Sequence, residues 1–259
     1  MVVAAGGWPS LRTISWIIVA CVAARSMAMT FNRLADRGYD ARNPRTRDRA
    51  LPAGLVTVSF ASAFAVVAAA LFVFASAMLN RLCFFLSPLA IVVLLGYSFC
   101  KRFTEGVHVA LGVALGLAPL GAWIAVRGSL DALPVLLAMG VVFWTAGFDI
   151  IYSCLDVECD RRENLHSLAA RFGIVRALRA ARWFHVFAVV CLVLFVVQMR
   201  LGPWSALALA VVSVLLFLEH SLVRAGDLSR VGPAFFTFNA WVSVVFFLGC
   251  AMDTMAGVW

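Results

Sequence analysis

The stretch "FNRLADRGYDARNPRTRDR" at residues 31–49 directly follows an apolar segment, and it carries three aspartates and six arginines. Carboxylates that continue a membrane-length segment are costly and usually functional. Asn32, Asp36 and Asp40 are spaced four residues apart, so on a continuing helix they share one face. The stretch therefore predicts a membrane helix that ends in a polar, acidic face.

Similar apolar segments recur along the chain, which is 64% hydrophobic and only 13% charged over 259 residues. A helix needs about 20 apolar residues to cross a bilayer. The segments do not alternate with a two-residue period, which argues against a transmembrane barrel. We therefore expect an all-α, polytopic transmembrane helical bundle that forms one domain over residues 1–259. The eight expected spans are Ile14–Phe31, Leu55–Leu79, Leu82–Phe99, Val107–Val126, Leu133–Leu155, Trp183–Met199, Trp204–Leu222 and Ala234–Met252.

The basic residues are distributed unevenly between the two ends of these spans. If the helices alternate in direction, sixteen of the 21 lysines and arginines lie on the side of the loop at 32–54. Such an excess marks the cytoplasmic side, and it explains the net charge of +8 without nucleic acid. We expect a multi-pass protein of the inner (cytoplasmic) membrane, in contact with lipid, with the loops around 32–54 and 156–182 in the cytoplasm. No protein partner is indicated.

A second acidic stretch, "FDIIYSCLDVECDR" at residues 148–161, closes the fifth expected span. Asp149, Asp156 and Asp160 share a face at 100° per residue, and Tyr152 lies near it. Four spans separate the two acidic stretches, so both helices run the same way and both acidic faces meet the same side. Two such faces suit hard cations such as Mg²⁺, which prefer oxygen ligands. The arginines around them suit a phosphate-bearing ligand, and a diphosphate bridged by Mg²⁺ satisfies both halves of the pattern.

These residues resemble the UbiA superfamily of intramembrane prenyltransferases. "NRLADRGYDARNPRTRDRALPAG" looks like its first aspartate-rich motif, N-x-x-x-D-x-x-x-D, and "DIIYSCLDVECD" looks like its second, D-x-x-Y-x-x-x-D-x-x-x-D. Between them, "YSFCKRFT" resembles the short basic motif of a cytoplasmic loop. The run Asn43-Pro44-Arg45-Thr46 is similar to the 4-hydroxybenzoate polyprenyltransferase branch. "NLHSLAARFG" also resembles relatives that prenylate a naphthoate for menaquinone.

The resemblance implies Mg²⁺-dependent transfer of a polyprenyl group from polyprenyl diphosphate to an aromatic acid, 4-hydroxybenzoate, in quinone biosynthesis. The implied Mg²⁺ ligands are Asn32, Asp36, Asp40, Asp156 and Asp160. The implied ligands of the diphosphate are Arg45, Arg49, Lys101 and Arg161. Catalytic roles fall to Asp149, Arg102 and Tyr152, with Asp149 paired to Arg102 to orient the acceptor.

Each of these roles has an alternative. The acids at helix ends could be helix caps, and the arginines could be topology determinants alone. The acceptor could be a dihydroxynaphthoate of menaquinone biosynthesis. A membrane transporter without enzymatic activity is a further alternative, because intramembrane charges also mark translocation paths. Two acidic faces at one membrane side, on helices that run in parallel, favour the enzyme.

The resemblance also implies nine helices, with the first motif at the end of the second. Here the motif ends the first of eight expected spans. The corresponding hypothesis is that Met1 is an internal start, or that the chain is a degraded copy, and the alternative is that eight helices suffice.

Overall fold

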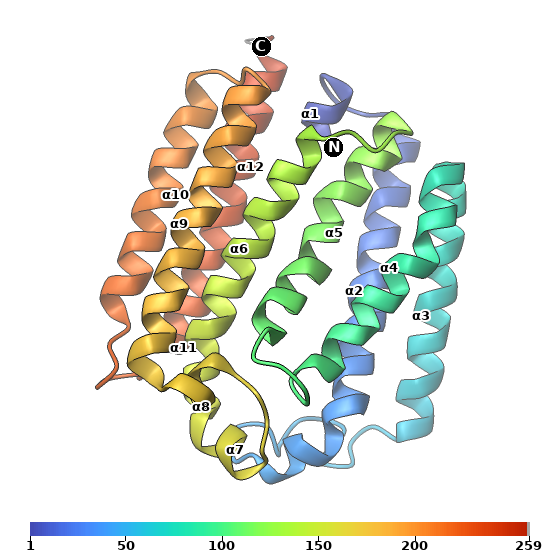
Figure 1. The fold of residues 1–259 in the computed structure, drawn as a ribbon. Coiled ribbons are helices and arrows are strands. Elements are labelled where there is room, and N and C mark those ends of the chain that lie inside the picture. Colours follow the sequence, from blue (N-terminus) through green and yellow to red (C-terminus); the bar gives the residue numbers. More distant parts are fainter. Residues whose placement is uncertain (258–259) are drawn as a thin grey trace.

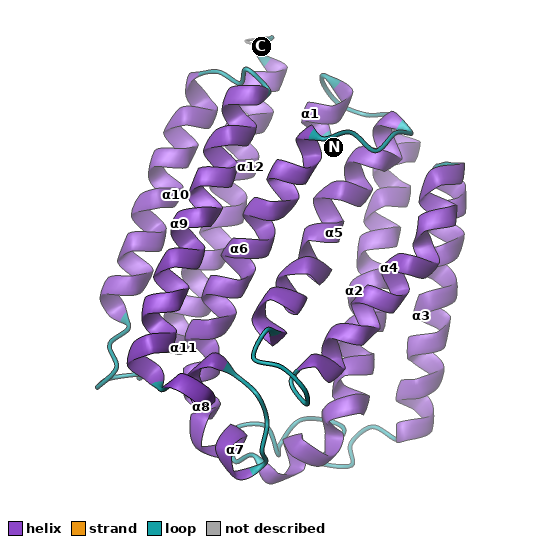
Figure 2. Ribbon diagram, in the orientation of Figure 1, coloured by secondary structure: helices purple, strands orange, loops and turns teal. Residues whose placement is uncertain are grey.

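The computed structural model describes residues 1–257, and within them it consists of helices joined by loops, with no strand (Figure 2). Eight of the described helices are long and apolar enough to cross a membrane, which confirms the expected fold class. They contain α2 (Leu11–Arg42), α3 (Val58–Leu79), α4 (Arg81–Cys100), α5 (Val107–Arg127), α6 (Leu133–Ser153), α9 (Ile174–Gln198), α10 (Pro203–Leu222) and α12 (Asn239–Met255). The fifth helix continues past α6 to Arg162, and the last begins before α12, at Phe236. The short elements are α1 (Val2–Ala5), η1 (Cys154–Asp156), α7 (Val157–Arg162), α8 (Leu168–Phe172), α11 (Val231–Pro233) and η2 (Ala234–Phe238).

The long helices form an up-and-down bundle in which α6 lies centrally between α5 and α9 (Figure 1). The pairs α2 with α3 and α10 with α12 flank this centre. The short helices α7 and α8 lie with the loop after α2 at one end of the bundle, whereas α1 and the end of α12 lie at the other. Both acidic stretches are therefore at the same end, which we call the acidic end.

Short polar side chains begin and end the helices. The Thr57 hydroxyl accepts from the Phe60 amide at 3.2 Å and caps α3. Asn80 is the one residue between α3 and α4, and its Oδ1 accepts from the Cys83 amide at 2.9 Å. The same side chain donates through Nδ2 to the Ile124 carbonyl at 2.8 Å, in the last turn of α5. Capping satisfies helix-end groups that lipid would leave unpaired.

Small residues let α5 and α6 approach closely, as in other membrane helix pairs. A Cβ at Gly112 would lie 2.4 Å from the Val142 carbonyl oxygen, and one at Gly116 would lie 3.0 Å from a Val142 methyl group. A larger side chain at Gly112 would push the two helices apart. This contact sets the position of α5 relative to α6, and both helices contribute to the site described below.

Two helices extend beyond their apolar segments. Helix α2 has 32 residues, a length of about 48 Å against a hydrocarbon core of about 30 Å. Its last turns therefore lie outside the core. Helix α9 begins at Ile174, nine residues before the expected Trp183, so Arg179 and Arg182 belong to the helix and not to a loop. Hydropathy marks the membrane-embedded part of a helix, whereas backbone hydrogen bonding continues past it.

Candidate active site at the acidic end

The first acidic face lies on the last turns of α2. The helix continues through Gly38 to Arg42, so Asn32, Asp36 and Asp40 do follow one another along one helix. Asn32 Nδ2 donates to Asp36 Oδ2 at 3.2 Å and to the Ser98 hydroxyl of α4 at 3.4 Å. Asp40 is buried, and its Oδ1 accepts from Arg49 Nη1 at 2.7 Å. The loop after α2 therefore folds back onto its own helix.

The second acidic stretch is not one continuous helix. Helix α6 ends at Ser153, the 3₁₀ turn η1 holds Asp156, and α7 begins at Val157 with Asp160 inside it. The 3₁₀ turn interrupts the regular α-helical repeat between Asp149 and Asp160, so the expectation that Asp149, Asp156 and Asp160 share one helical face stays a prediction. Two of these carboxylates are buried: Asp156 is 8% exposed and Asp160 is 1% exposed. Buried carboxylates need charged or hydrogen-bonding partners.

Arg45 joins the first stretch to the second. Its Nε donates to Asp156 Oδ1 at 2.9 Å, its Nη2 pairs with Asp156 Oδ2, and its Nη1 donates to the Tyr152 hydroxyl at 2.7 Å. Asn43 Nδ2 also donates to Asp156 Oδ1 at 2.8 Å. Burial acts to lower the pKa of Arg45, but the bond to Asp156 outweighs it and the pKa is raised. Such forked contacts are strong and directional.

Lys101, which follows the last turn of α4, is the second cationic link. Its Nζ lies 2.7 Å from Asp160 Oδ1. Burial acts to lower the pKa of Lys101, but the charge of Asp160, with smaller contributions from Asp156 and Asp36, raises it above the ordinary value. The ammonium therefore stays protonated at neutral pH and interacts electrostatically with carboxylates of both acidic stretches.

Arg102 contacts the first acidic stretch and not Asp149. Its Nη2 donates to the Ala35 carbonyl at 2.7 Å and lies 3.9 Å from Asp36 Oδ1, while its Nε is buried without a hydrogen bond. The guanidinium lies over the rings of Tyr39 and Phe99, 5.5 Å and 5.0 Å from their centroids. The expected pairing of Asp149 with Arg102 is therefore wrong.

Asp149 instead pairs with a histidine of the neighbouring helix α5. His108 is 2% exposed, and its Nδ1 lies 2.7 Å from Asp149 Oδ2. The Leu168 amide donates to His108 Nε2 at 3.4 Å, so Nε2 is the acceptor and Nδ1 carries the proton that bonds Asp149. The sequence held a signal for this residue, because a buried polar side chain in an apolar segment requires a partner.

The sequence analysis did not predict an ion pair at the edge of the site. Arg42, one of the loop arginines that could act as a topology determinant alone, donates through Nε and Nη2 to the carboxylate of Glu163 at 2.6–2.9 Å. It ties the end of α2 to the residue after α7. Arg161 is exposed, and its Nε donates to the Ala170 carbonyl at 3.0 Å, so among its described contacts none reaches an acidic side chain.

The oxygen-rich donor set fits a hard divalent cation. Asp40 Oδ2 and Asp160 Oδ2 are buried and make no hydrogen bond in the described part of the chain. Within residues 1–257, however, no cluster of three acidic, histidine or cysteine side chains is arranged to hold a metal ion. The carboxylates are instead neutralised by Arg45, Arg49 and Lys101.

The His108–Asp149 contact predicts an effect on stability. His108→Phe leaves the Asp149 carboxylate without its donor, which costs about 1–3 kcal/mol, so the thermal unfolding midpoint in detergent is expected to fall by several degrees. The matched control is His166→Phe, whose ring contacts Glu105 at a half-buried site nearer to solvent, and this variant should unfold near the parent temperature. Equal midpoints for both variants would show that the buried contact contributes nothing.

Comparison with known proteins agrees with the fold and identifies the family. Residues 1–247 match the UbiA prenyltransferase family. The 4-hydroxybenzoate octaprenyltransferase of Idiomarina loihiensis is 30% identical over 97% of this chain and 88% of its own. The apo structure of a UbiA homologue from Aeropyrum pernix K1 superimposes with a TM-score of 0.87 at 30% identity, covering 95% of this chain and 91% of that one. A UbiA homologue from Archaeoglobus fulgidus bound to GPP and Mg²⁺ has the same fold, with a TM-score of 0.65 at 19% identity over 92% and 89%. This multi-pass membrane protein therefore belongs to the UbiA prenyltransferase family and is a prenyltransferase.

Proposed function

We propose that this prenyltransferase transfers a polyprenyl group from polyprenyl diphosphate to 4-hydroxybenzoate in an Mg²⁺-dependent reaction of quinone biosynthesis. The observation that carries the proposal is the joining of the two acidic stretches by Arg45 and Lys101 at one end of the bundle. The name of the Idiomarina loihiensis relative supports the acceptor. The Archaeoglobus fulgidus neighbour, bound to GPP and Mg²⁺, supports the class of donor and the metal.

In this proposal Asn32, Asp36, Asp40, Asp156 and Asp160 would hold Mg²⁺, which would supply charge neutralisation for the departing diphosphate. Arg45, Arg49 and Lys101 pair with carboxylates. With those carboxylates engaged as metal ligands, the same three side chains would be free to bind the diphosphate oxygens. The geometry supports Arg161 less well than these three as a ligand of the diphosphate, because its Nε donates to the Ala170 carbonyl and not to an acidic side chain.

The chemical step breaks the bond between the first prenyl carbon and the diphosphate oxygen, and the electron pair leaves with the diphosphate. The allylic cation is attacked by the electron-rich ring of the acceptor, a carbon–carbon bond forms, and the ring loses a proton. Tyr152, held by Arg45, presents a ring suited to a cation. We assign Asp149, fixed by His108, to orienting the acceptor, with Arg102 beside Asp36 at the entrance.

The test is an assay of membranes that contain the expressed protein, with Mg²⁺ and radiolabelled polyprenyl diphosphate. Each acceptor is supplied in turn, and labelled product is expected with 4-hydroxybenzoate. Product with a dihydroxynaphthoate alone would overturn the acceptor and place the protein in menaquinone biosynthesis. No product with either acceptor, from correctly inserted protein, would overturn the proposed reaction.

We further propose that the acidic end faces the cytoplasm. Arg47 is exposed in the loop after α2, and Arg127 is exposed at the opposite end, in the last turn of α5. In a background without native cysteines, Arg47→Cys is expected to resist an impermeant maleimide in intact cells and to react in inverted vesicles. Arg127→Cys, the matched control, should show the reverse. Labelling of Arg47→Cys in intact cells would reverse this orientation.

A further inference from the structure

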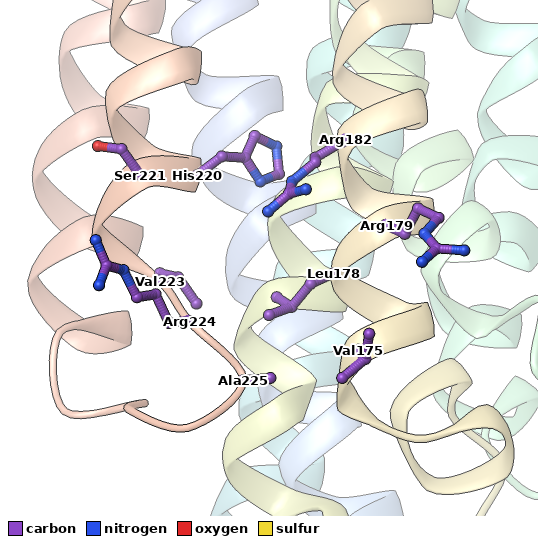
Figure 3. Close-up of a pocket in the computed structure, with 9 residues that line it drawn as sticks. All are labelled: Val175, Leu178, Arg179, Arg182, His220, Ser221, Val223, Arg224 and Ala225. Carbon is purple, nitrogen blue, oxygen red and sulfur yellow. The ribbon is translucent and has the colours of Figure 1, made fainter.

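A basic pocket lies between α9 and α10, outside the candidate active site. It has a volume of about 420 Å³ and is lined by residues from the start of α9, the end of α10 and the loop that follows. Three arginines contribute to its lining, Arg179 and Arg182 from α9 and Arg224 from the loop. None of the residues of the acidic stretches lines it. Figure 3 shows Arg182 and His220 pointing toward one another, with Arg224 beside the end of α10.

The positive charge of this pocket is only partly compensated, because the nearby carboxylate of Asp227 interacts electrostatically with Arg224 but forms no ion pair with it. No acidic side chain lines it, and none of the three arginines forms an ion pair within the described part of the chain. Asp227, in the loop after α10, uses Oδ1 to accept from the Ser229 hydroxyl at 2.6 Å. The arginines at the active site behave differently, because Arg42, Arg45 and Arg49 each pair with a carboxylate. Three unpaired guanidinium groups at one pocket predict an anionic ligand.

One wall of the pocket, formed by His220, is held by hydrogen bonds to the buried core. His220 Nε2 lies 3.0 Å from Nδ1 of His185, which is 3% exposed and reaches the Trp144 carbonyl with its Nε2 at 3.3 Å. A carbonyl only accepts, so His185 carries its proton on Nε2 and accepts from His220. Gly147 makes room for this ring, since a Cβ there would lie 2.2 Å from His185. The orientation of His220 is therefore set from within the bundle.

Apart from Ser221, the rest of the lining is apolar, and this apolar surface continues onto the outer surface of the helices. Leu178 and Val223 are buried at the pocket. On α9, Trp183 lies four residues after Arg179 and is 60% exposed, and on α10 Phe217 precedes Ser221 by four residues and is 72% exposed. Residues four apart lie on one helical face. A ligand with an anionic head at the arginines would therefore have apolar helix surface beside it for a hydrocarbon tail.

We propose that this pocket binds the phosphate group of an anionic membrane phospholipid. The phosphate oxygens would accept from Arg182 and Arg224, and the acyl chains would lie along the exposed apolar faces of α9 and α10. Arg179 would add positive charge at the edge of the pocket, since its head group points away from those two arginines in Figure 3. Arginine forks match phosphate geometry, and basic pockets between membrane helices bind anionic headgroups. The inference does not depend on the prenyl-transfer reaction, because it uses none of the residues assigned to that reaction.

The test is native mass spectrometry of the full chain in detergent, titrated with phosphatidylglycerol and, separately, with phosphatidylcholine. Phosphatidylglycerol is expected to bind more tightly. The double variant Arg182→Gln with Arg224→Gln should weaken its binding by about tenfold or more, at roughly 1 kcal/mol for each arginine. The matched control, Arg127→Gln with Arg200→Gln, removes the same charge at the other end of the bundle and should bind like the parent. The double variant Arg182→Lys with Arg224→Lys keeps both charges and should retain most of the binding.

Equal affinity for phosphatidylglycerol and phosphatidylcholine would overturn the proposal. So would an equal loss of phosphatidylglycerol affinity in the pocket variant and the control variant. A pocket variant that is folded, with an unchanged thermal midpoint, and binds phosphatidylglycerol like the parent would also overturn it. A competition arm with inorganic phosphate distinguishes the sources of the ligand. Failure of free phosphate to displace phosphatidylglycerol supports the lipid, whereas displacement at matched concentration would overturn the lipid in favour of a soluble phosphate.

Discussion

Chelation of divalent cations with EDTA is expected to abolish prenyl transfer by this protein, and added Mg²⁺ or Mn²⁺ should restore it. Asp156 and Asp160 are buried at the acidic end beside Arg45 and Lys101. The side chains of Arg45 and Lys101 neutralise these carboxylates only as long as no diphosphate competes for the two basic groups. A diphosphate adds negative charge to a site that already contains several carboxylates, so without a metal ion repulsion opposes substrate binding and leaving-group stabilisation is lost.

The loss is expected to be on the order of a thousandfold or more, since removing preorganised stabilisation of a developing charge costs about 4 kcal/mol. The measurement is the initial rate of labelled product formation in washed membranes. EDTA already saturated with Mg²⁺ is the control, and it should leave the rate unchanged. An unchanged rate in metal-free membranes would contradict the assignment of the acidic stretches to metal binding.

Asp156→Ala is expected to lower kcat by about 10²–10³, the range found for loss of one strong electrostatic contact in a transition state. Both Asp156 oxygens are engaged, with Asn43 and Arg45 on one side of the site. Its loss leaves Arg45 without its carboxylate and removes one proposed ligand. Asp36→Ala, on the facing stretch, is expected to cause a loss of the same order.

Asp48→Ala provides a matched control. Asp48 is in the same loop as Arg45, but its side chain is 91% exposed, so its removal should leave turnover within about twofold, as for other exposed charges. All variants should insert and purify as monodisperse protein. Because Asp156→Ala could also loosen the loop, Asp156→Asn is tested beside it: it keeps the acceptor oxygen toward Asn43 but loses the charge. Full activity in both Asp156 variants would refute the two-stretch metal site.

The number of spans and the first acidic face could be predicted from sequence because both depend on local properties. An apolar run of about 20 residues is long enough to cross a bilayer whatever surrounds it. Asn32, Asp36 and Asp40 follow one face of α2 because the four-residue spacing matches the helix repeat and Gly38 does not end the helix. That both acidic stretches lie at the same side of the membrane follows from the number of spans between them.

The partners of the acids could not be predicted, because they join residues far apart in the chain. Six arginines lie within residues 33–49, and nothing in the local pattern selects Arg45 for Asp156, 111 residues away. That contact depends on the loop after α2 folding back to the 3₁₀ turn at Cys154–Asp156, which holds Asp156. His108 reaches Asp149 because α5 packs closely on α6 at Gly112.

The basic pocket was also decided by tertiary packing. Hydropathy placed Arg179 and Arg182 in a loop, whereas α9 begins at Ile174 and holds both on a helix beside α10. Apolar length and helical spacing determine which segments cross the membrane and which residues share a face, because both act between near neighbours. Charge pairing depends on distance in three dimensions, so which carboxylates are neutralised and which arginines stay unpaired is settled only when the helices pack.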